Sequence, residues 1–348
     1  MRAAVFDGFG EPLRVREVAD PPCPRDGVVL AVEACGVCRS DWHGWRGADP
    51  GLPLPHVPGH EVAGIVVEVG RDCGRLRIGD RVTAPFILGC GRCADCLGGE
   101  PTVCSDQTIV GFSGWGAFAE RLAVPRADYN LVRIPDGLDG VTVAGMGCRV
   151  TTAFRALVDR ASLAPGEWLV VHGCGGVGLS AVAIGAALGA SVVAVDVNPA
   201  ALELACTLGA THALNASRVD DVGAAVRELT GGGAAVSLEG LGVTATFENS
   251  LRSLRPLGRH VQVGMPTGRH ATPTLPLLDL VYSRQLTLLG TRGMAAQGFG
   301  SLFSMLLAGR LDLAPLVTQR IPLDGAGDAL AAFDGFAGVG ITVIDRFT

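Results

Sequence analysis

Four cysteines lie close together in the sequence with the spacing C-x2-C-x2-C-x7-C, namely Cys90, Cys93, Cys96 and Cys104. Four thiolates on so short a loop can close a tetrahedron around Zn²⁺, and a site without an open coordination position is structural. Buried reduced thiols and a zinc ribbon that binds nucleic acid are the alternatives. The clustering argues against the first, and the net charge of −6 argues against the second. The sequence therefore predicts a structural zinc site within residues 90–104.

A glycine-rich turn of the form G-x-G-x-x-G directly follows the apolar run Trp168–Val171. Between a strand and a helix, such glycines make a tight turn, let the backbone approach a pyrophosphate and let the helix pack closely on the strand. Asp196 follows 18 residues after Gly178, where a carboxylate accepts hydrogen bonds from a ribose and repels a 2′-phosphate. We therefore expect an NAD site. Its predicted residues are Gly173, Gly175, Gly176, Val177, Gly178 and Asp196.

A second set of metal-ligand types is dispersed along the chain. Cys38 lies in GVCRSDWHGWRG, His60 in GHE and Cys148 in GMGCRVTTAF. Two thiolates and one imidazole would leave the fourth position of a zinc ion open, as in catalytic sites. Spacing alone does not join these three residues, because a lone cysteine or histidine more often belongs to the core or the surface.

The elements that must position these residues differ between the two parts of the chain. Up to about residue 145, short β-like runs such as Val28–Val32, Glu61–Val69 and Arg81–Ala84 alternate with Gly, Pro and Asp, which predicts a compact β domain. From about Thr151, helical stretches alternate with apolar strands, which predicts βαβ units and a parallel sheet. The expected strands of this part are Trp168–Val171, Ser191–Val195, Ala234–Leu238, Arg259–Val263 and Leu286–Leu289.

The uncharged stretch Trp168–Val195 spans 28 residues and is long enough to cross a bilayer. It divides into an apolar run, the glycine turn, a small-residue helix and a second apolar run, which favours a strand–turn–helix–strand unit over a membrane span. The N-terminal residues carry charges throughout and lack a signal-peptide core, so we expect a cytoplasmic protein without membrane or nucleic-acid partners. In that reducing compartment, the eleven cysteines would be metal ligands or free thiols.

Further motifs complete a family pattern: GVCRSD-x-H at Gly36–His43, GHEVAG-x5-G at Gly59–Gly70, GDRV at Gly79–Val82, GAFAE at Gly116–Glu120 and VGM at Val263–Met265. With the cysteine loop, the glycine turn and the Cys148 segment, the sequence resembles the zinc-dependent alcohol dehydrogenases of the medium-chain dehydrogenase/reductase superfamily over nearly its whole length. The Cys148 segment is most similar to the tetrameric yeast and bacterial branch. The resemblance implies an NAD(H)-dependent enzyme that interconverts alcohols and carbonyl compounds, with one catalytic and one structural zinc per chain.

The resemblance also implies the fold class and the metal ligands. The fold would be α/β, with a GroES-like, β-rich catalytic domain formed by residues 1–148 and 291–348, including the structural-zinc loop at 90–104. Residues 149–290 would form a Rossmann domain with a doubly wound parallel sheet. Cys38, His60 and Cys148 would hold the catalytic zinc. A homotetramer is the expected assembly, and a dimer is the alternative.

Other residues acquire roles from the same resemblance. Asp41 matches a carboxylate that orients the ligand His60, and Glu61 matches a glutamate that approaches the metal during ligand exchange. Ser40 matches the hydroxyl that takes the substrate proton, and His43 matches the imidazole that relays this proton to solvent. Three further residues match cofactor-binding positions, namely Arg39 at the pyrophosphate and Val263 and Gly264 in the VGM motif. The basic residue that many relatives carry near the C-terminus is missing from the stretch Val339–Val343.

The substrate is less constrained by the sequence. Trp42 and Trp45 flank His43 and could either line a small apolar pocket or pack against the β domain. Ser40 is smaller than the threonine of many relatives, which suggests bulkier or secondary alcohols and their ketones. A polyol or formaldehyde dehydrogenase on the same scaffold, a zinc-free quinone-type reductase and a non-catalytic zinc- and NAD-binding subunit are the alternative functions.

Overall fold

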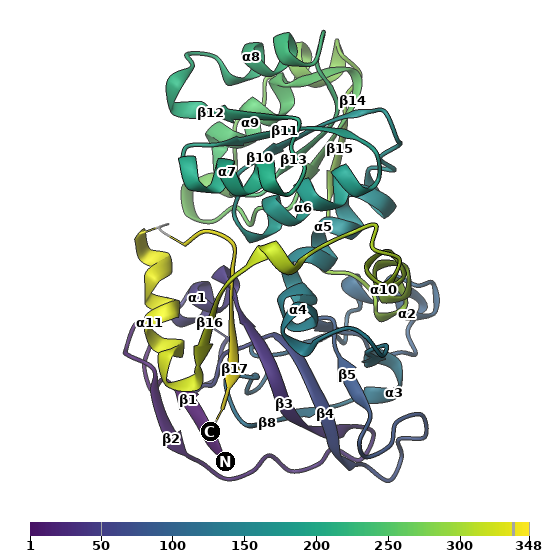
Figure 1. Cartoon of the computed structure of the whole chain (residues 1–348), viewed down its shortest axis with the longest axis vertical. Coiled ribbons are helices and arrows are strands. Elements are labelled where there is room, and N and C mark those ends of the chain that lie inside the picture. Colours follow the sequence, from purple (N-terminus) through teal and green to yellow (C-terminus); the bar gives the residue numbers. More distant parts are fainter. Residues whose placement is uncertain (50, 336–337, 348) are drawn as a thin grey trace. The chain divides into compact units, whose positions relative to one another are not determined.

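The structure is a computed structural model of the chain that describes residues 1–49, 51–335 and 338–347. These residues form two compact units (Figure 1). The first unit comprises Met1–Thr151, Gly293–Leu307 and Val317–Thr348, and the second comprises Thr152–Arg292 and Ala308–Leu316. Among the described helices, none is both long and apolar enough to cross a membrane.

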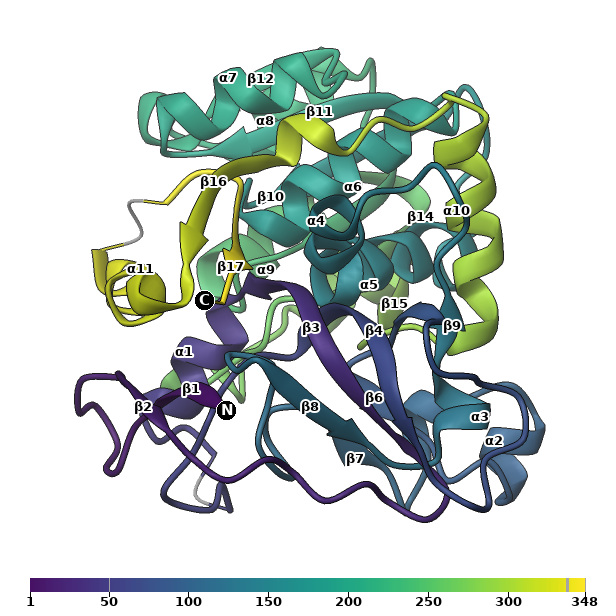
Figure 2. The ribbon, with the colours of Figure 1, turned by 60° about the horizontal axis from the view of Figure 1, so that its bottom comes forward.

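The first unit is built mainly from β-strands, as the sequence predicts. Its largest sheet has seven strands in the order β16-β17-β3-β4-β5-β9, with β8 paired to β3. Figure 2 shows β3, β4 and β8 side by side, in agreement with their antiparallel pairing. The strands of this unit are β1 (Arg2–Val5), β2 (Arg14–Glu17), β3 (Val28–Val37), β4 (Glu61–Val69), β5 (Arg81–Thr83), β6 (Ile87–Leu88), β7 (Thr108–Ile109), β8 (Arg121–Val124), β9 (Val132–Arg133), β16 (Val317–Pro322) and β17 (Ile341–Arg346).

Short helices connect and cover these strands. A large apolar core, in which Phe6, Leu30, Val66 and Phe118 are buried, holds the elements of this unit together. The helices are α1 (Arg39–Trp45), α2 (Ala94–Leu97), α3 (Ala127–Asn130), α4 (Gly140–Gly145), α10 (Phe299–Leu307) and α11 (Ala326–Ala331). A π-helical turn, Met146–Val150, joins α4 to α5 (Thr151–Arg155), and it carries Cys148.

The second unit contains a six-stranded, fully parallel sheet in the order β12-β11-β10-β13-β14-β15. The chain reverses its direction of strand addition between β10 and β13, and ligands of such doubly wound sheets bind where the carboxyl ends of the strands meet at this point. The helices α6 and α7 pack together on one face of the sheet, and α8 and α9 pack together on the other (Figure 1). The elements are β10 (Trp168–His172), α6 (Gly176–Ala187), β11 (Ser191–Asp196), α7 (Pro199–Thr207), β12 (His212–Asn215), α8 (Val222–Leu229), β13 (Ala234–Glu239), α9 (Thr244–Arg252), β14 (Leu254–Gln262) and β15 (Thr287–Gly290).

The uncharged stretch Trp168–Val195 forms β10, the glycine turn, α6 and β11, so the prediction of a strand–turn–helix–strand unit is confirmed. Two boundaries differ from the expectation by several residues, and the other strand ends of this unit differ by at most one residue. β14 begins at Leu254 rather than Arg259, because Leu254 already pairs with Ala234 of β13. Residues 308–316, which we expected in the first domain, group with the second unit because the 3-10 turn Ala314–Leu316 packs on α6.

Candidate active site and structural metal site

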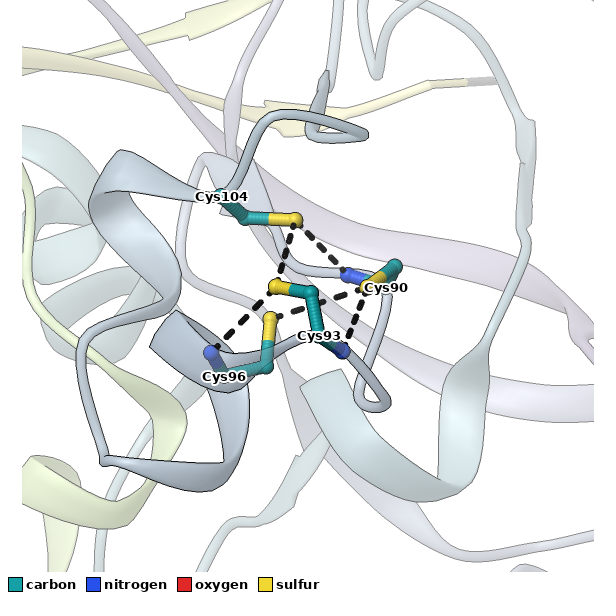
Figure 3. A group of neighbouring side chains, drawn as sticks. All are labelled: Cys90, Cys93, Cys96 and Cys104. Atoms are coloured by element: carbon teal, nitrogen blue, oxygen red, sulfur yellow. Dashed lines mark hydrogen bonds between the residues drawn. The ribbon is translucent and has the colours of Figure 1, made fainter.

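The four clustered cysteines converge in the first unit (Figure 3). The sulfur of Cys90 lies 3.9 Å from that of Cys96, and the sulfur of Cys93 lies 3.7 Å from that of Cys104. Backbone N–H groups also point at these sulfurs: Cys93 N–H donates to Cys90 Sγ at 3.3 Å, and Cys90 N–H donates to Cys104 Sγ at 3.4 Å. Within the described residues, none of these cysteines forms a disulfide.

The chemistry of this loop fits a bound zinc ion. Backbone N–H groups of Arg92 and Cys93 lower the pKa of Cys90 to about 6, so a thiolate is available at neutral pH. Cys93 is also the N-cap of α2 and accepts the Cys96 N–H, which fixes the second and third sulfurs relative to each other. Four protein sulfurs would fill a tetrahedral shell, so the residues suit a structural role.

Cys38, His60 and Cys148, which are far apart in the sequence, also come together in the first unit. Their ligand atoms and a carboxylate oxygen of Glu61 all lie within 4.8 Å of one another, and all four residues are buried. Cys38 directly follows β3 as the N-cap of α1, His60 and Glu61 lie where β4 begins, and Cys148 lies on the π-helical turn. Such π-turns within helices often occur at functional sites.

Asp41 orients this group. Its Oδ1 pairs with His60 Nδ1 at 2.7 Å and accepts the Gly59 N–H at 3.0 Å, while its Oδ2 accepts the Cys38 N–H at 3.0 Å. The remaining ring nitrogen, His60 Nε2, is buried and has no hydrogen-bond partner in the part of the chain that the structure describes. An orphaned imidazole nitrogen beside two cysteine sulfurs fits a zinc ligand whose other nitrogen is held by a carboxylate.

The electrostatics of the site favour a cation. A hydrogen bond with the Cys148 thiol and the charge of Arg149 hold the pKa of Cys38 well below its ordinary value. Both effects favour the thiolate form of Cys38. Metal binding requires deprotonated thiols, so this thiol suits a metal ligand.

Arg149 is a residue of this site that the sequence analysis missed. It is 5% exposed and forms a fork-like pair with Glu61, in which Nε donates to Oε1 at 3.1 Å and Nη2 donates to Oε2. Burial raises the pKa of Glu61, and the charge of Arg149 opposes that effect. A signal was present, since a single arginine in the apolar segment around Cys148 needs a buried partner.

The predicted proton-relay residues lie on α1. Ser40 Oγ lies 3.8 Å from Cys38 Sγ, and His43 follows one helical turn later. His43 is half-buried beside Trp42. Its pKa is lowered mainly by burial and secondarily by the positive charge of Arg39. Both groups therefore lie on the short helix that Cys38 caps.

The two tryptophans of α1 have different environments. Trp45 is buried in the apolar core and donates its Nε1–H to the Glu11 carbonyl, so it packs the β domain. Trp42 donates to Asp334 Oδ1 at 2.7 Å. Arg39 lies over the Trp42 ring, 4.7 Å from its centroid, and donates to the Phe333 carbonyl at 3.2 Å.

In the second unit, the predicted nucleotide turn joins β10 to α6. Gly173 has a φ of +91°, which favours glycine, and a Cβ on Gly178 would lie 1.8 Å from the Gly173 carbonyl oxygen. A Cβ on Gly175 would meet none of the described atoms within 4 Å, so this face of the turn is open. An open glycine at the start of α6, where Gly176 and Val177 expose N–H groups, fits an approaching pyrophosphate.

The remaining predicted cofactor residues lie at the carboxyl ends of β11 and β14, on the same edge of the parallel sheet. Asp196 ends β11, and its carboxylate accepts the N–H groups of Cys174 at 2.6 Å and Asn198 at 2.8 Å. Val263 and Gly264 donate to the Glu239 carbonyl at 3.0 and 2.8 Å. Glu239 is itself buried, and its carboxylate accepts the Gly242 N–H at 2.9 Å. Sequence reasoning missed this residue, whose signal was an acid at the end of an apolar strand.

Comparison with known proteins agrees with this geometry. The alcohol dehydrogenase GroES-like domain family matches residues 24–136, and the zinc-binding dehydrogenase family matches residues 176–307. An alcohol dehydrogenase of Geobacillus stearothermophilus is 39% identical over 297 residues, which are 84% of this chain and 85% of the relative. An NAD-dependent alcohol dehydrogenase of Sulfurisphaera tokodaii is 32% identical over 354 residues and 99% of each chain. The solved alcohol dehydrogenase of Thermus sp. ATN1 matches with a TM-score of 0.91 and 31% identity over 100% of both chains. The predicted GroES-like and Rossmann architecture is thereby confirmed.

Proposed function

This chain belongs to the zinc-dependent alcohol dehydrogenases of the medium-chain dehydrogenase/reductase superfamily, and from that premise we propose that Cys38, His60 and Cys148 hold its catalytic zinc. The chain is an NAD(H)-dependent oxidoreductase that interconverts alcohols with aldehydes or ketones. Cys90, Cys93, Cys96 and Cys104 would hold the structural zinc. The observation that carries the proposal is the orphaned His60 Nε2 beside the two buried sulfurs.

When bound, zinc supplies a Lewis acid for the substrate oxygen and NAD⁺ supplies the hydride acceptor. Asp41 holds the His60 ring so that Nε2 faces the metal position. Ser40, next to Cys38, accepts the hydroxyl proton of the alcohol, and His43 carries it onward to solvent. The neutral form of His43 is the one that can accept a proton, and its lowered pKa favours that form at neutral pH.

The cofactor is held by residues of the second unit. The N–H groups at the start of α6 bind the pyrophosphate, and Asp196 accepts hydrogen bonds from the adenosine ribose. Val263 and Gly264, fixed on the Glu239 carbonyl, complete the cofactor-binding edge. The family resemblance assigns Arg39 to the pyrophosphate as well.

The test removes one ligand of the catalytic zinc at a time. Cys38→Ala or His60→Ala should abolish turnover, lower the zinc content from two ions to one per chain and leave NADH binding intact. Cys35→Ala removes a buried neighbouring thiol that is not a ligand and serves as the matched control. Substantial turnover in a zinc-depleted Cys38→Ala protein would contradict the proposal.

The substrate proposal rests on the small Ser40 side chain beside Cys38, which leaves room for secondary or bulky alcohols and their ketones. A polyol or formaldehyde dehydrogenase is the alternative. Initial rates with a panel of primary, secondary and benzylic alcohols, polyols and formaldehyde–thiol adducts would separate them. A preference for small primary alcohols would contradict the proposal.

We further propose a homotetramer located in the cytoplasm, with a dimer as the alternative assembly. The edge strand β15 is paired on one side only among the described strands. Exposed apolar side chains gather in the segments that precede it, namely Leu257, Leu277, Leu278 and Tyr282. Light scattering on the purified chain gives its mass, and a monomer would contradict this assembly.

A further inference from the structure

Glu61 is the fourth possible ligand of the catalytic metal position. Its carboxylate lies within 4.8 Å of the ligand atoms of Cys38, His60 and Cys148. A glutamate that joined these three residues would complete a four-coordinate protein shell. Such a closed shell is typical of structural zinc, whereas an alcohol substrate needs an open position. The position of the Glu61 carboxylate therefore determines whether the site can accept a substrate.

In the structure, this carboxylate accepts hydrogen bonds from residues of the π-helical turn. Glu61 Oε1 accepts the N–H groups of Cys148 at 3.0 Å and Arg149 at 3.1 Å, together with the Arg149 Nε–H at 3.1 Å. Glu61 Oε2 accepts the Arg149 Nη2–H. Both oxygens are thus bound by the fork of a guanidinium, which matches a carboxylate in shape and charge.

Two glycines make space for this pair. A Cβ on Gly36 would lie 2.2 Å from Glu61 Oε2 and 2.9 Å from Arg149 Nη2, and a Cβ on Gly147 would lie 2.8 Å from Glu61 Cα. Backbone therefore encloses the Glu61–Arg149 pair from β3 on one side and from the π-helical turn on the other. A side chain at either glycine would force the pair to shift, so both glycines are needed for this arrangement.

We propose that Arg149 is a positioning residue that holds Glu61 away from the catalytic zinc and so keeps the fourth coordination position open for the substrate. This inference rests on the proposed zinc site. Without Arg149, the unpaired carboxylate is attracted by the divalent cation beside it, joins Cys38, His60 and Cys148, and closes the site. Glu61 alone is then the inhibitory group, and its removal restores access.

The experiment uses Co²⁺ in place of zinc and imidazole as the probe of the open position. Imidazole that binds the metal shifts the visible cobalt bands, and the four-sulfur site, which is closed, does not respond. We expect imidazole to bind the cobalt-loaded wild type and to bind Arg149→Gln about 10- to 100-fold more weakly, the range typical of outer-sphere substitutions. The double variant Glu61→Gln/Arg149→Gln should regain the wild-type affinity.

The double variant separates positioning from general damage, because a purely structural loss at Arg149 would not be repaired by a second substitution. Arg149→Lys keeps the charge but loses the fork, so it should show an intermediate affinity, and it carries the test if the glutamine variant does not fold. Arg81→Gln, which breaks the forked pair of Arg81 with Glu33 elsewhere in the first unit, is the matched control and should bind imidazole as the wild type does.

Three results would overturn the inference. Wild-type imidazole affinity in both Arg149→Gln and Arg149→Lys would show that the arginine does not hold the site open. A double variant that stays as weak as Arg149→Gln would show that Glu61 is not the closing group. If imidazole does not shift the cobalt bands of the wild type, the open zinc site itself is refuted. This result is distinguishable from the first two, which concern Arg149 and Glu61 only.

Discussion

Asp41 orients two ligands of the proposed catalytic zinc at once, because one of its oxygens lies 2.7 Å from His60 Nδ1 and the other accepts the Cys38 N–H at 3.0 Å. It does so from the first turn of α1, whose N-cap is Cys38. A single carboxylate therefore ties the end of β3 to the beginning of β4.

The first prediction concerns a variant that loses one of the two contacts of Asp41. Asp41→Asn keeps the size of the side chain but replaces one acceptor oxygen by an amide donor, so either His60 or Cys38 loses its partner. We expect zinc affinity at the catalytic site to fall about 10- to 100-fold. Zinc retention against a chelator measures this effect. Asp128→Asn, which alters another aspartate that accepts backbone N–H groups, should retain both ions. Equal retention in the two variants would contradict the role of Asp41.

The second prediction separates the two metals. Cys93→Ser removes a ligand of the proposed structural zinc but keeps a side chain that can cap α2. The variant should bind one zinc per chain and keep most of its turnover at low temperature. Its Tm should fall by more than about 5 °C, since each kcal/mol lowers Tm by about 2–4 °C in domains of this size. Calorimetry measures this Tm, and the control is Cys23→Ser, which removes a free thiol outside the loop. An unchanged Tm would contradict a structural metal.

The third prediction concerns cofactor choice. The wild type should bind NADH far more tightly than NADPH, because the Asp196 carboxylate repels a 2′-phosphate. Asp196→Asn removes the charge and keeps an acceptor for the turn N–H groups. This variant should bind NADH about 10-fold or more weakly, because hydrogen bonds to charged groups contribute about 1.5–3 kcal/mol. The difference between its affinities for NADH and NADPH should also become smaller. Fluorescence titrations measure both cofactor affinities, and the control is Asp220→Asn, which alters an exposed acid of the same unit. A wild type that prefers NADPH would refute the assignment.

Sites whose members lie close in the sequence were predictable from the sequence alone. The four-cysteine loop spans residues 90–104, and the nucleotide turn needs only one strand, the three residues 173–175 and one helix. Their spacing determines their geometry almost independently of the rest of the fold. The same holds for the elements of the parallel sheet, whose apolar runs match β10, β11 and β13 closely.

The catalytic site depends on tertiary structure instead. Cys38, His60 and Cys148 come from three elements, and only the resemblance to a known family joined them. The pairing of Arg149 with Glu61 crosses 88 positions, and no local pattern encodes it. The sequence indicates that a buried arginine must have a partner, but the choice of partner follows from how the π-helical turn meets β4.

The fourth prediction tests the relay through His43. Burial, and to a smaller extent the charge of Arg39, lowers the pKa of His43. The neutral imidazole, which can accept a proton, therefore remains populated at a pH below the usual histidine pKa of about 6.5. The rate of alcohol oxidation should therefore decline only as the pH falls below that range. His43→Ala should lose about 10²-fold in kcat and shift its pH–rate profile to alkaline pH, because the proton must then leave Ser40 directly to solvent. Profiles of kcat between about pH 5 and pH 8 measure the shift, and His212→Ala in the second unit is the control. A profile that is the same in His43→Ala and the wild type would remove His43 from the relay, whatever the loss in rate.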